Sequence, residues 1–309
     1  MRLRNSEHEP MDRKLIKLGD LKVAIRWLPA VVIAGLLPSR WWPLPARAYA
    51  AATTWTPRWR RRRDELGSLL NRHRPDLPAK NWSRAYAAHV FMRELSTMRM
   101  YLRPRWRPVT RVTGAEHIEQ ALAAGRGTIL WVTPLVYSDL ITKVALAEAG
   151  FSVHHLSRYS HPYSDTLVGE HLINPVPQRI ERRFLASRLV IPPGGMVAVL
   201  RQLTKSLRRG ELVSITVGQR GRNTVRRPFL DGHISVASGA PDLARRTGAP
   251  LLPVFTARQS DGSFDTIVES PLVPDTEATA DAEMDRLVVA WVPLYEKHVF
   301  EHPDQLRWS

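Results

Sequence analysis

The sequence predicts an α/β fold in which a mixed central sheet is flanked by helices. Three observations support this prediction. A buried, β-favouring run at 128–132 is followed by a tight turn and by a helical pattern that stops at Gly150, which gives the order strand, turn, helix. Further apolar runs alternate with amphipathic segments along the chain. A hydrophobic content of 44% in 309 residues is enough for a large core.

The first fifty residues are predicted to form a tail and a membrane-associated helix, ahead of an α/β domain at 51–309. Residues 13–37 are basic at first and then apolar, but Arg26 and Pro29 interrupt them. A clean membrane span needs about 20 apolar residues. We therefore favour a helix that lies on or dips into the cytoplasmic leaflet. A helix packed on the domain and a true span are the alternatives.

The composition indicates an anionic partner. The net charge is +16, and several of the ten tryptophans stand beside arginine, which is typical of the membrane–water interface. The run RWRRRR at 58–63 is either a solvated loop or a polybasic contact with anionic membrane lipid. Nucleic acid is not expected as a partner, because no helix-turn-helix, RNP-like or zinc-finger pattern occurs. The absence of cysteine excludes disulfides and thiol nucleophiles.

Before the central unit, the chain reads as mostly helical. The pattern predicts a short helix at 64–70, a loop at 71–76, a long helix at 82–102 capped by Asn81 or Ser83, a strand at 109–112 and a helix that ends near 124.

After Gly150, strands and helices alternate. Strands are predicted at 151–156, 211–217, 251–256 and 264–269, a turn at 190–195, and helices at 196–209 and 282–299. His154 and His155 fall in the first of these strands and point to opposite faces, so one of them should be buried and hydrogen-bonded.

The central unit resembles the lipid A biosynthesis acyltransferase family of the late, lauroyl or myristoyl type, within the lysophospholipid acyltransferase superfamily. That family places His-x-x-x-x-Glu/Asp at the turn after this strand. The acidic end matches as Asp139, whereas Pro134 occupies the histidine position. Weaker matches follow the family order at 114–117, 226–232 and in the tail at 303–308. The resemblance covers roughly residues 60–309.

The resemblance implies a membrane-associated acyltransferase at the cytoplasmic face of the inner membrane. It would transfer a fatty acyl group from acyl carrier protein or acyl-CoA to a lipid or glycolipid hydroxyl. In the family the carboxylate orients the histidine, which takes the proton of the acceptor hydroxyl. Pro134 has no base, and Gly218 stands where the family has an aspartate. A catalytically degenerate protein that binds a lipid or a partner is therefore the alternative.

Candidate site residues follow from these matches. Asp139 is the retained carboxylate, and His161 and His233, both read as loop residues, are the candidates for a relocated base. Cations for the phosphate of a lipid or carrier are supplied by Arg158, Arg220, Arg226 and Arg227. Metal-ligand spacing, a phosphate loop and a dinucleotide fingerprint are all absent from the sequence, so neither a metal nor a cofactor is expected.

Overall fold

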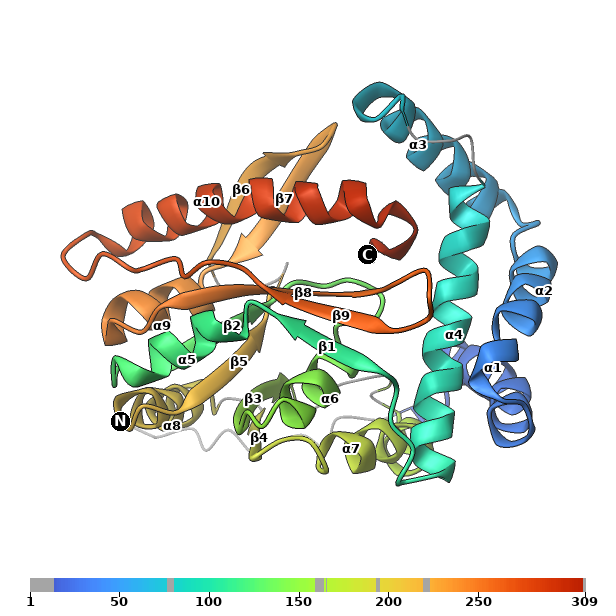
Figure 1. The fold of residues 1–309 in the computed structure, drawn as a ribbon, viewed down its shortest axis with the longest axis horizontal. Helices are drawn as coiled ribbons and strands as arrows, with labels where there is room; N and C mark the ends of the chain where they lie inside the picture. Colours follow the sequence, from blue (N-terminus) through green and yellow to red (C-terminus); the bar gives the residue numbers. More distant parts are fainter. Residues whose placement is uncertain are drawn as a thin grey trace, which may run out of the picture.

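The central sheet of the protein is mixed, as the sequence predicted. The computed structural model describes residues 14–76, 81–158, 164, 166–192, 195–218 and 223–307. Seven of the described strands form the central sheet in the order β1-β9-β8-β2-β5-β3-β4 (Figure 1). Their bounds are β1 (Thr110–Thr113), β2 (Thr128–Val132), β3 (Val153–Arg158), β4 (Ser187–Ile191), β5 (Leu212–Thr216), β8 (Leu251–Arg258) and β9 (Phe264–Val268).

Strand direction places several strand ends at one edge of the sheet. β2 pairs in parallel with both β5 and β8, β5 pairs in parallel with β3, and β3 with β4. β9 returns antiparallel to β8, and β1 follows β9 in parallel. The carboxyl ends of β8, β2, β5, β3 and β4 therefore share an edge, which is where open α/β sheets usually bind ligands.

Helices cover both faces of the sheet. On one face, α8 (Met196–Arg208), α9 (Gly239–Thr247) and α10 (Ala280–Glu301) pack on a core that includes Trp131 and Phe255. On the other face, α5 (Ala115–Ala123) and α6 (Ile141–Glu148) cover Leu130 and Val254. The central strands β2, β5 and β8 are buried at nearly every position. Because successive side chains of a strand point to opposite faces, both faces of the sheet need a helical cover.

A layer of helices stands beside the sheet. In Figure 1, α4 (Trp82–Leu102) runs along one end of the sheet, and α1 (Leu18–Leu36) and α2 (Pro43–Thr53) lie on the outer side of α4. The buried side chains of α1, α2 and α4 form one core with those of α6 and α7 (Pro175–Glu181). None of the described helices combines the length and the apolar character that crossing a membrane requires.

Most predicted elements are confirmed within a few residues. The helix predicted at 82–102 is α4 with the same bounds, and the Asn81 side chain accepts the N–H of Arg84 as its cap. Gly150 ends the segment after α6 with a φ of 88°. His155 is buried and bonded to Ser214, while His154 is only half-buried.

Three predictions of local structure were wrong. The solvated-loop alternative for the run at 58–63 is contradicted: the run is helical, within α3 (Pro57–His73), because arginine is a good helix former and Pro57 suits a helix start. Residues 190–191, predicted as turn, are the last two residues of the edge strand β4. Most side chains of β4 are half-buried, so apolar and polar residues alternate only weakly along it. The loop expected around His233 is instead a hairpin, β6 (Thr224–Phe229) and β7 (Gly232–Ala237).

Candidate active site

The turn between β2 and α6, residues 133–140, is held rigidly by its own hydrogen bonds; we call it the motif turn. The Ser138 hydroxyl donates to the carbonyl oxygen of Thr133 at 2.6 Å and accepts the N–H of Leu135 at 3.0 Å. The indole of Trp291 on α10 donates to the Thr133 hydroxyl at 3.1 Å. Pro134 and Asp139 are half-buried, whereas the residues between them are buried. The backbone therefore brings these two positions toward the surface.

The Asp139 carboxylate is paired with an arginine. The Nη1 atom of Arg307 lies 2.9 Å from Oδ1 and 2.7 Å from Oδ2 of Asp139. The two side chains are 24% and 39% exposed, so the pair is accessible to a ligand. Sequence reasoning did not select Arg307. The signal that could have identified Arg307 was its place in the tail at 303–308, the segment with a family match. Arg307 comes 168 positions after Asp139 in the sequence.

The C-terminal tail, residues 303–307, is anchored across the motif turn. Leu306 forms an antiparallel bridge with Leu135, and the Val136 N–H donates to the Gln305 carbonyl oxygen at 2.9 Å. The Gln305 side chain bonds both the N–H and the carbonyl oxygen of Arg258, at the end of β8, at 2.8 and 2.9 Å. The tail is thus fixed by both neighbours, which fixes the position from which Arg307 reaches Asp139.

A second polar cluster lies behind the motif turn. The Nδ1 atom of His89 on α4 is 2.8 Å from the Tyr137 hydroxyl, and Nε2 is 3.6 Å from Oδ2 of Asp304. Burial raises the pKa of Tyr137 well above its usual range. The cluster joins α4, the motif turn and the tail in the interior, so we interpret it as a structural connection.

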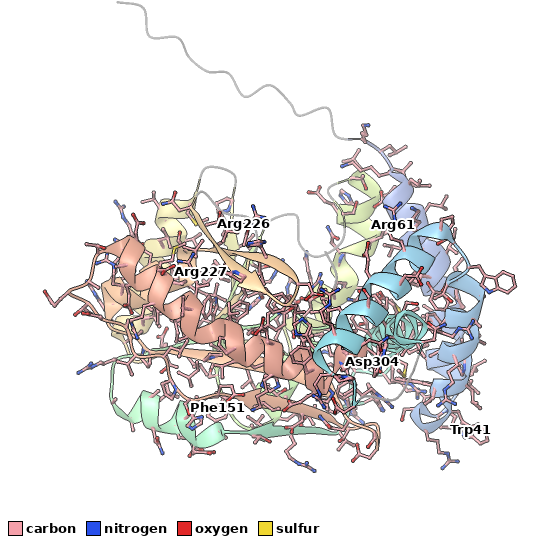
Figure 2. All side chains as sticks on the ribbon, turned by 90° about the horizontal axis from the view of Figure 1, so that it is seen from above. Trp41, Arg61, Phe151, Arg226, Arg227 and Asp304 are labelled. Carbon is pink, nitrogen blue, oxygen red and sulfur yellow. The ribbon has the colours of Figure 1, made fainter. Side chains whose placement is uncertain are left out.

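The structure places the three hairpin candidates on two different faces of the hairpin. His233 is exposed and pairs with Pro228, so its side chain lies on the outward face of the hairpin, as does that of Arg226. Arg227 is on the other face and forms an ion pair with Asp285 of α10. Figure 2 shows Arg226 and Arg227 well away from Asp304 in the tail.

Positions along α10 show that Arg227 lies away from the motif turn. The Tyr295 hydroxyl donates to the carbonyl oxygen of Pro134 at 3.4 Å. Asp285, the partner of Arg227, is ten residues earlier on the same helix, which is about 15 Å along the helix axis. Arg227 therefore does not lie at the motif turn.

The remaining candidates are placed only in part. Arg158 is the last residue of β3 and so lies at the carboxyl edge of the sheet. Gly218 follows β5, and its carbonyl oxygen accepts the N–H of Ala237 at 2.7 Å, which ties the hairpin to the sheet. His161 and Arg220 lie outside the described residues.

A comparison with models of known protein families identifies the family of this chain. The model of the bacterial lipid A biosynthesis acyltransferase family matches residues 71–308. The chain belongs to this family. The match runs from the end of α3 through the tail, and so includes the motif turn, the hairpin and Arg307. A comparison with curated proteins finds no match. Membership in the family suggests acyl transfer to a lipid as the class of reaction.

Proposed function

We propose that this chain transfers a fatty acyl group from a thioester of acyl carrier protein or coenzyme A to a lipid hydroxyl at the cytoplasmic face of the inner membrane, without a histidine at the motif turn. The family match supports the reaction class. The observation that carries the altered site is the pair of Asp139 with Arg307 beside Pro134, where the family resemblance places a histidine.

In the proposed transfer, the protein holds the acceptor hydroxyl near the thioester and stabilises the negative charge that develops. The acceptor hydroxyl attacks the thioester carbonyl carbon, the carbon–sulfur bond breaks, and the proton of the hydroxyl passes through solvent to the departing thiolate. Negative charge develops on the carbonyl oxygen, and the accessible guanidinium of Arg307 is suited to stabilise it. Because a general base typically contributes 10²–10⁴-fold, the reaction is expected to be slower by about that factor than one with a histidine.

The outward face of α1 supports the membrane location. Its large apolar side chains recur at helical spacing and are between 49% and 77% exposed: Leu18, Leu21, Ile25, Leu28, Val32 and Leu36. We call these six side chains the α1 stripe. The stripe extends along about 27 Å of helix. A contiguous apolar surface of this size marks an interaction site.

The inward face of α1 fixes the helix to the domain. Val23, Ala30 and Ala34 are buried. The Trp27 indole donates to Glu94 of α4 at 2.9 Å, and Arg26 lies 3.3 Å from the same carboxylate. Arg26, which interrupts the apolar run in the sequence, thus faces α4 and not the stripe. The helix is built to lie on a surface while attached to the domain.

We assign an anionic bilayer as the occupant of the α1 stripe, because exposed cations border it. Lys14, Lys17 and Lys22 are exposed near its first turns, and Arg40 and Trp41 are exposed after its last. A basic residue near an anionic membrane contributes roughly 1 kcal/mol, and tryptophan favours the interface. Leu28→Ser should weaken binding to anionic vesicles roughly tenfold, as expected for loss of one buried leucine. Dimerisation of the wild type through the stripe would contradict this assignment.

A second candidate function is a non-catalytic relative that binds a lipid or a partner enzyme. Pro134 provides no base, and the carboxylate of Asp139 is already paired with Arg307. If no acyl transfer is detected, the missing base at Pro134 and the existing pair of Asp139 with Arg307 both favour the non-catalytic role.

The deciding experiment follows acyl transfer by mass spectrometry. Purified protein is given acyl carrier protein or coenzyme A thioesters, with vesicles that contain a lipid acceptor. Slow product formation is expected from the wild type and less from Arg307→Leu. Arg227→Leu is the matched control, because it breaks an arginine–aspartate pair away from the motif turn. Absence of product from the wild type with either donor would favour the non-catalytic candidate. Equal rates in both variants would contradict the altered site.

A further inference from the structure

A dense group of arginines gathers at the C-terminal end of α4. The loop that follows α4 contributes to it, and so does α7, which lies beside this end of α4 (Figure 1). From α7 and the residues after it, arginines donate to the Tyr101 hydroxyl at 3.3 Å and to the carbonyl oxygens of Met100 and Pro104 at 2.9 Å. We call six side chains the α4-end cluster: Arg99, Arg103, Arg105, Arg107, Arg179 and Arg183.

The positive charge of the α4-end cluster is compensated only in small part. Across the described residues, one of the six guanidiniums has an acidic partner: the Nε atom of Arg107 lies 3.0 Å from Glu148. Arg99 and Arg103 donate instead to carbonyl oxygens at the end of α1. A helix C-terminus carries only about half a negative charge. The ends of α1 and α4 together therefore offset about one of the five remaining cations.

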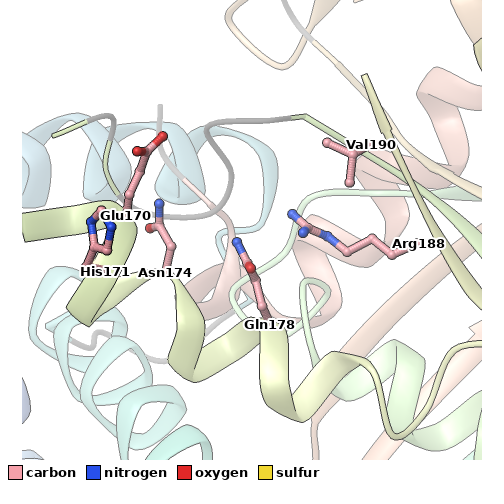
Figure 3. A pocket seen from close by; sticks show the side chains of 6 residues that line it. All are labelled: Glu170, His171, Asn174, Gln178, Arg188 and Val190. Carbon is pink, nitrogen blue, oxygen red and sulfur yellow. The ribbon is translucent and has the colours of Figure 1, made fainter. Parts of the chain in front are cut away.

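Arg99 is the most deeply buried cation of the cluster. It is only 6% exposed, its guanidinium lies over the Trp42 ring, and its Nε atom has no hydrogen-bond partner among the described residues. Burial and the charge of Arg103 lower its pKa. Arg188 of β4, shown in Figure 3, is also largely buried, but its Nε atom lies 3.7 Å from the carboxylate of Glu181. An external anion would therefore stabilise the α4-end cluster, which has no such internal carboxylate beside Arg99.

The α4-end cluster borders the end of the α1 stripe. Leu36, the last member of the stripe, and Leu102 of α4 are 77% and 43% exposed. The rings of Trp42, which follows η1 (Ser39–Trp41), and of Trp106, in the loop after α4, lie 5.7 Å apart. The ends of α1 and α4 thus form one surface on which large apolar side chains stand among arginines. This composition is typical of the membrane–water interface.

We propose that the α4-end cluster binds the phosphates of anionic lipids and so anchors the C-terminal end of α1 on the bilayer. The lipid is bound as part of the membrane surface and not as the acyl acceptor. The inference rests on the membrane location in the proposed function. Exposed lysines border the first turns of α1, and the α4-end cluster borders its last turn, so cations at both ends hold the helix parallel to the bilayer. Guanidinium suits this contact because it forms paired hydrogen bonds with phosphate oxygens.

The test measures sedimentation with phosphatidylcholine vesicles that contain or lack phosphatidylserine. The double variant Arg105→Gln with Arg179→Gln removes two exposed cations of the cluster. Its affinity for the phosphatidylserine vesicles should fall about 30-fold, or about 2 kcal/mol, while its binding to the neutral vesicles should not change.

The matched control removes two exposed cations elsewhere. Arg201→Gln with Arg208→Gln lowers the net charge by the same amount on α8, which lies at the other end of the sheet from α4 (Figure 1). Because salt screens charges that lie more than about 10 Å from the lipid, this control should lose less than about threefold in affinity.

Three outcomes would overturn the proposal. The cluster variant could bind phosphatidylserine vesicles as tightly as the wild type does. The control could lose as much affinity as the cluster variant, which would mean that only the net charge matters. Acyl carrier protein could bind the wild type without vesicles and fail to bind the cluster variant, which would assign the cluster to an acidic protein partner.

The test is separable from the proposed function. Binding is measured without turnover, so a wild type that forms no acyl product would refute the transfer reaction and leave the cluster assignment intact. Leu28→Ser should weaken binding to both kinds of vesicle, because it acts on the apolar stripe, whereas the cluster variant should affect only the anionic vesicles.

Discussion

Two carboxylates of this protein are paired with arginine in contrasting surroundings. Glu94, on α4, is fully buried and lies 2.9 Å from Arg93 and 3.3 Å from Arg26. Asp139, in the motif turn, is partly exposed with Arg307. Burial by itself would raise the pKa of Glu94, but Arg93, Arg26 and the hydrogen bond from Trp27 outweigh it and lower the pKa. Glu94 is therefore a buried anion that depends on its partners.

The contrast separates a structural pair from an accessible one. Removing one partner of a buried pair leaves an uncompensated charge and costs several kcal/mol, whereas exposed pairs typically contribute 1 kcal/mol or less. The Glu94 cluster attaches α1 to α4, and the Asp139 pair is placed where a ligand can replace or join it. Carboxylate–arginine pairs thus attach α1 to the domain in one place and lie in the candidate site in the other.

The largest effect is expected from Glu94→Gln. The change keeps the shape and a hydrogen-bond acceptor for Trp27 but removes the buried negative charge that faces Arg26 and Arg93. The free energy of unfolding should fall by about 3 kcal/mol, as measured by urea denaturation at neutral pH. Glu119→Gln, an exposed residue of α5, is the control and should change it by less than about 0.5 kcal/mol. If Glu94→Gln lowered the free energy of unfolding by less than about 1 kcal/mol, the buried Glu94 pair would contribute no more to stability than an exposed pair does.

The next effect concerns the rate of acyl transfer. The double variant Pro134→His with Arg307→Leu places a histidine in the motif turn and frees Asp139 to orient it. Transfer should rise roughly 100-fold over the wild type, or about 2.7 kcal/mol of barrier, at the lower end of what a general base contributes. Arg307→Leu alone and Pro134→Ala are the controls and should not rise. An unchanged rate in the double variant would mean that the turn does not present position 134 to the substrate.

Low pH should remove the contribution of the Glu94 carboxylate to the free energy of unfolding. Because the folded pKa of Glu94 is below its ordinary value of 4.5, the unfolded state binds more protons near that pH, and stability is lost as the pH falls through the folded pKa. Urea midpoints of wild type and Glu94→Gln should therefore differ most above about pH 5 and converge as the pH falls below 4.5 and through the folded pKa of Glu94. A difference that stays constant with pH would show that the carboxylate charge is not what stabilises the cluster.

Local structure was predictable where the chain carries its own signals, and long-range pairing was not. The cap at Asn81 and the apolar periodicity gave α4 with the correct ends. By contrast, Arg26 appeared in the sequence as an interruption of a membrane span, because its partner Glu94 comes from another helix. The strand, turn and helix pattern put Asp139 at the start of the helix, and Asp139 lies in the turn just before α6. Its pairing with Arg307 depends on a tail that the sequence pattern does not position.

The smallest effect is expected for the stability of Arg307→Leu. The pair with Asp139 is partly exposed, and the tail keeps its anchors through Gln305 and Leu306, so the free energy of unfolding should fall by less than about 1 kcal/mol. Urea denaturation measures it beside Arg227→Leu, whose pair with Asp285 is similarly exposed. A loss for Arg307→Leu as large as that for Glu94→Gln would mean that the pair holds the tail in place. Asp139 would then be structural like Glu94, and a fall in transfer rate for Arg307→Leu would have to be attributed to a displaced tail and not to a lost guanidinium.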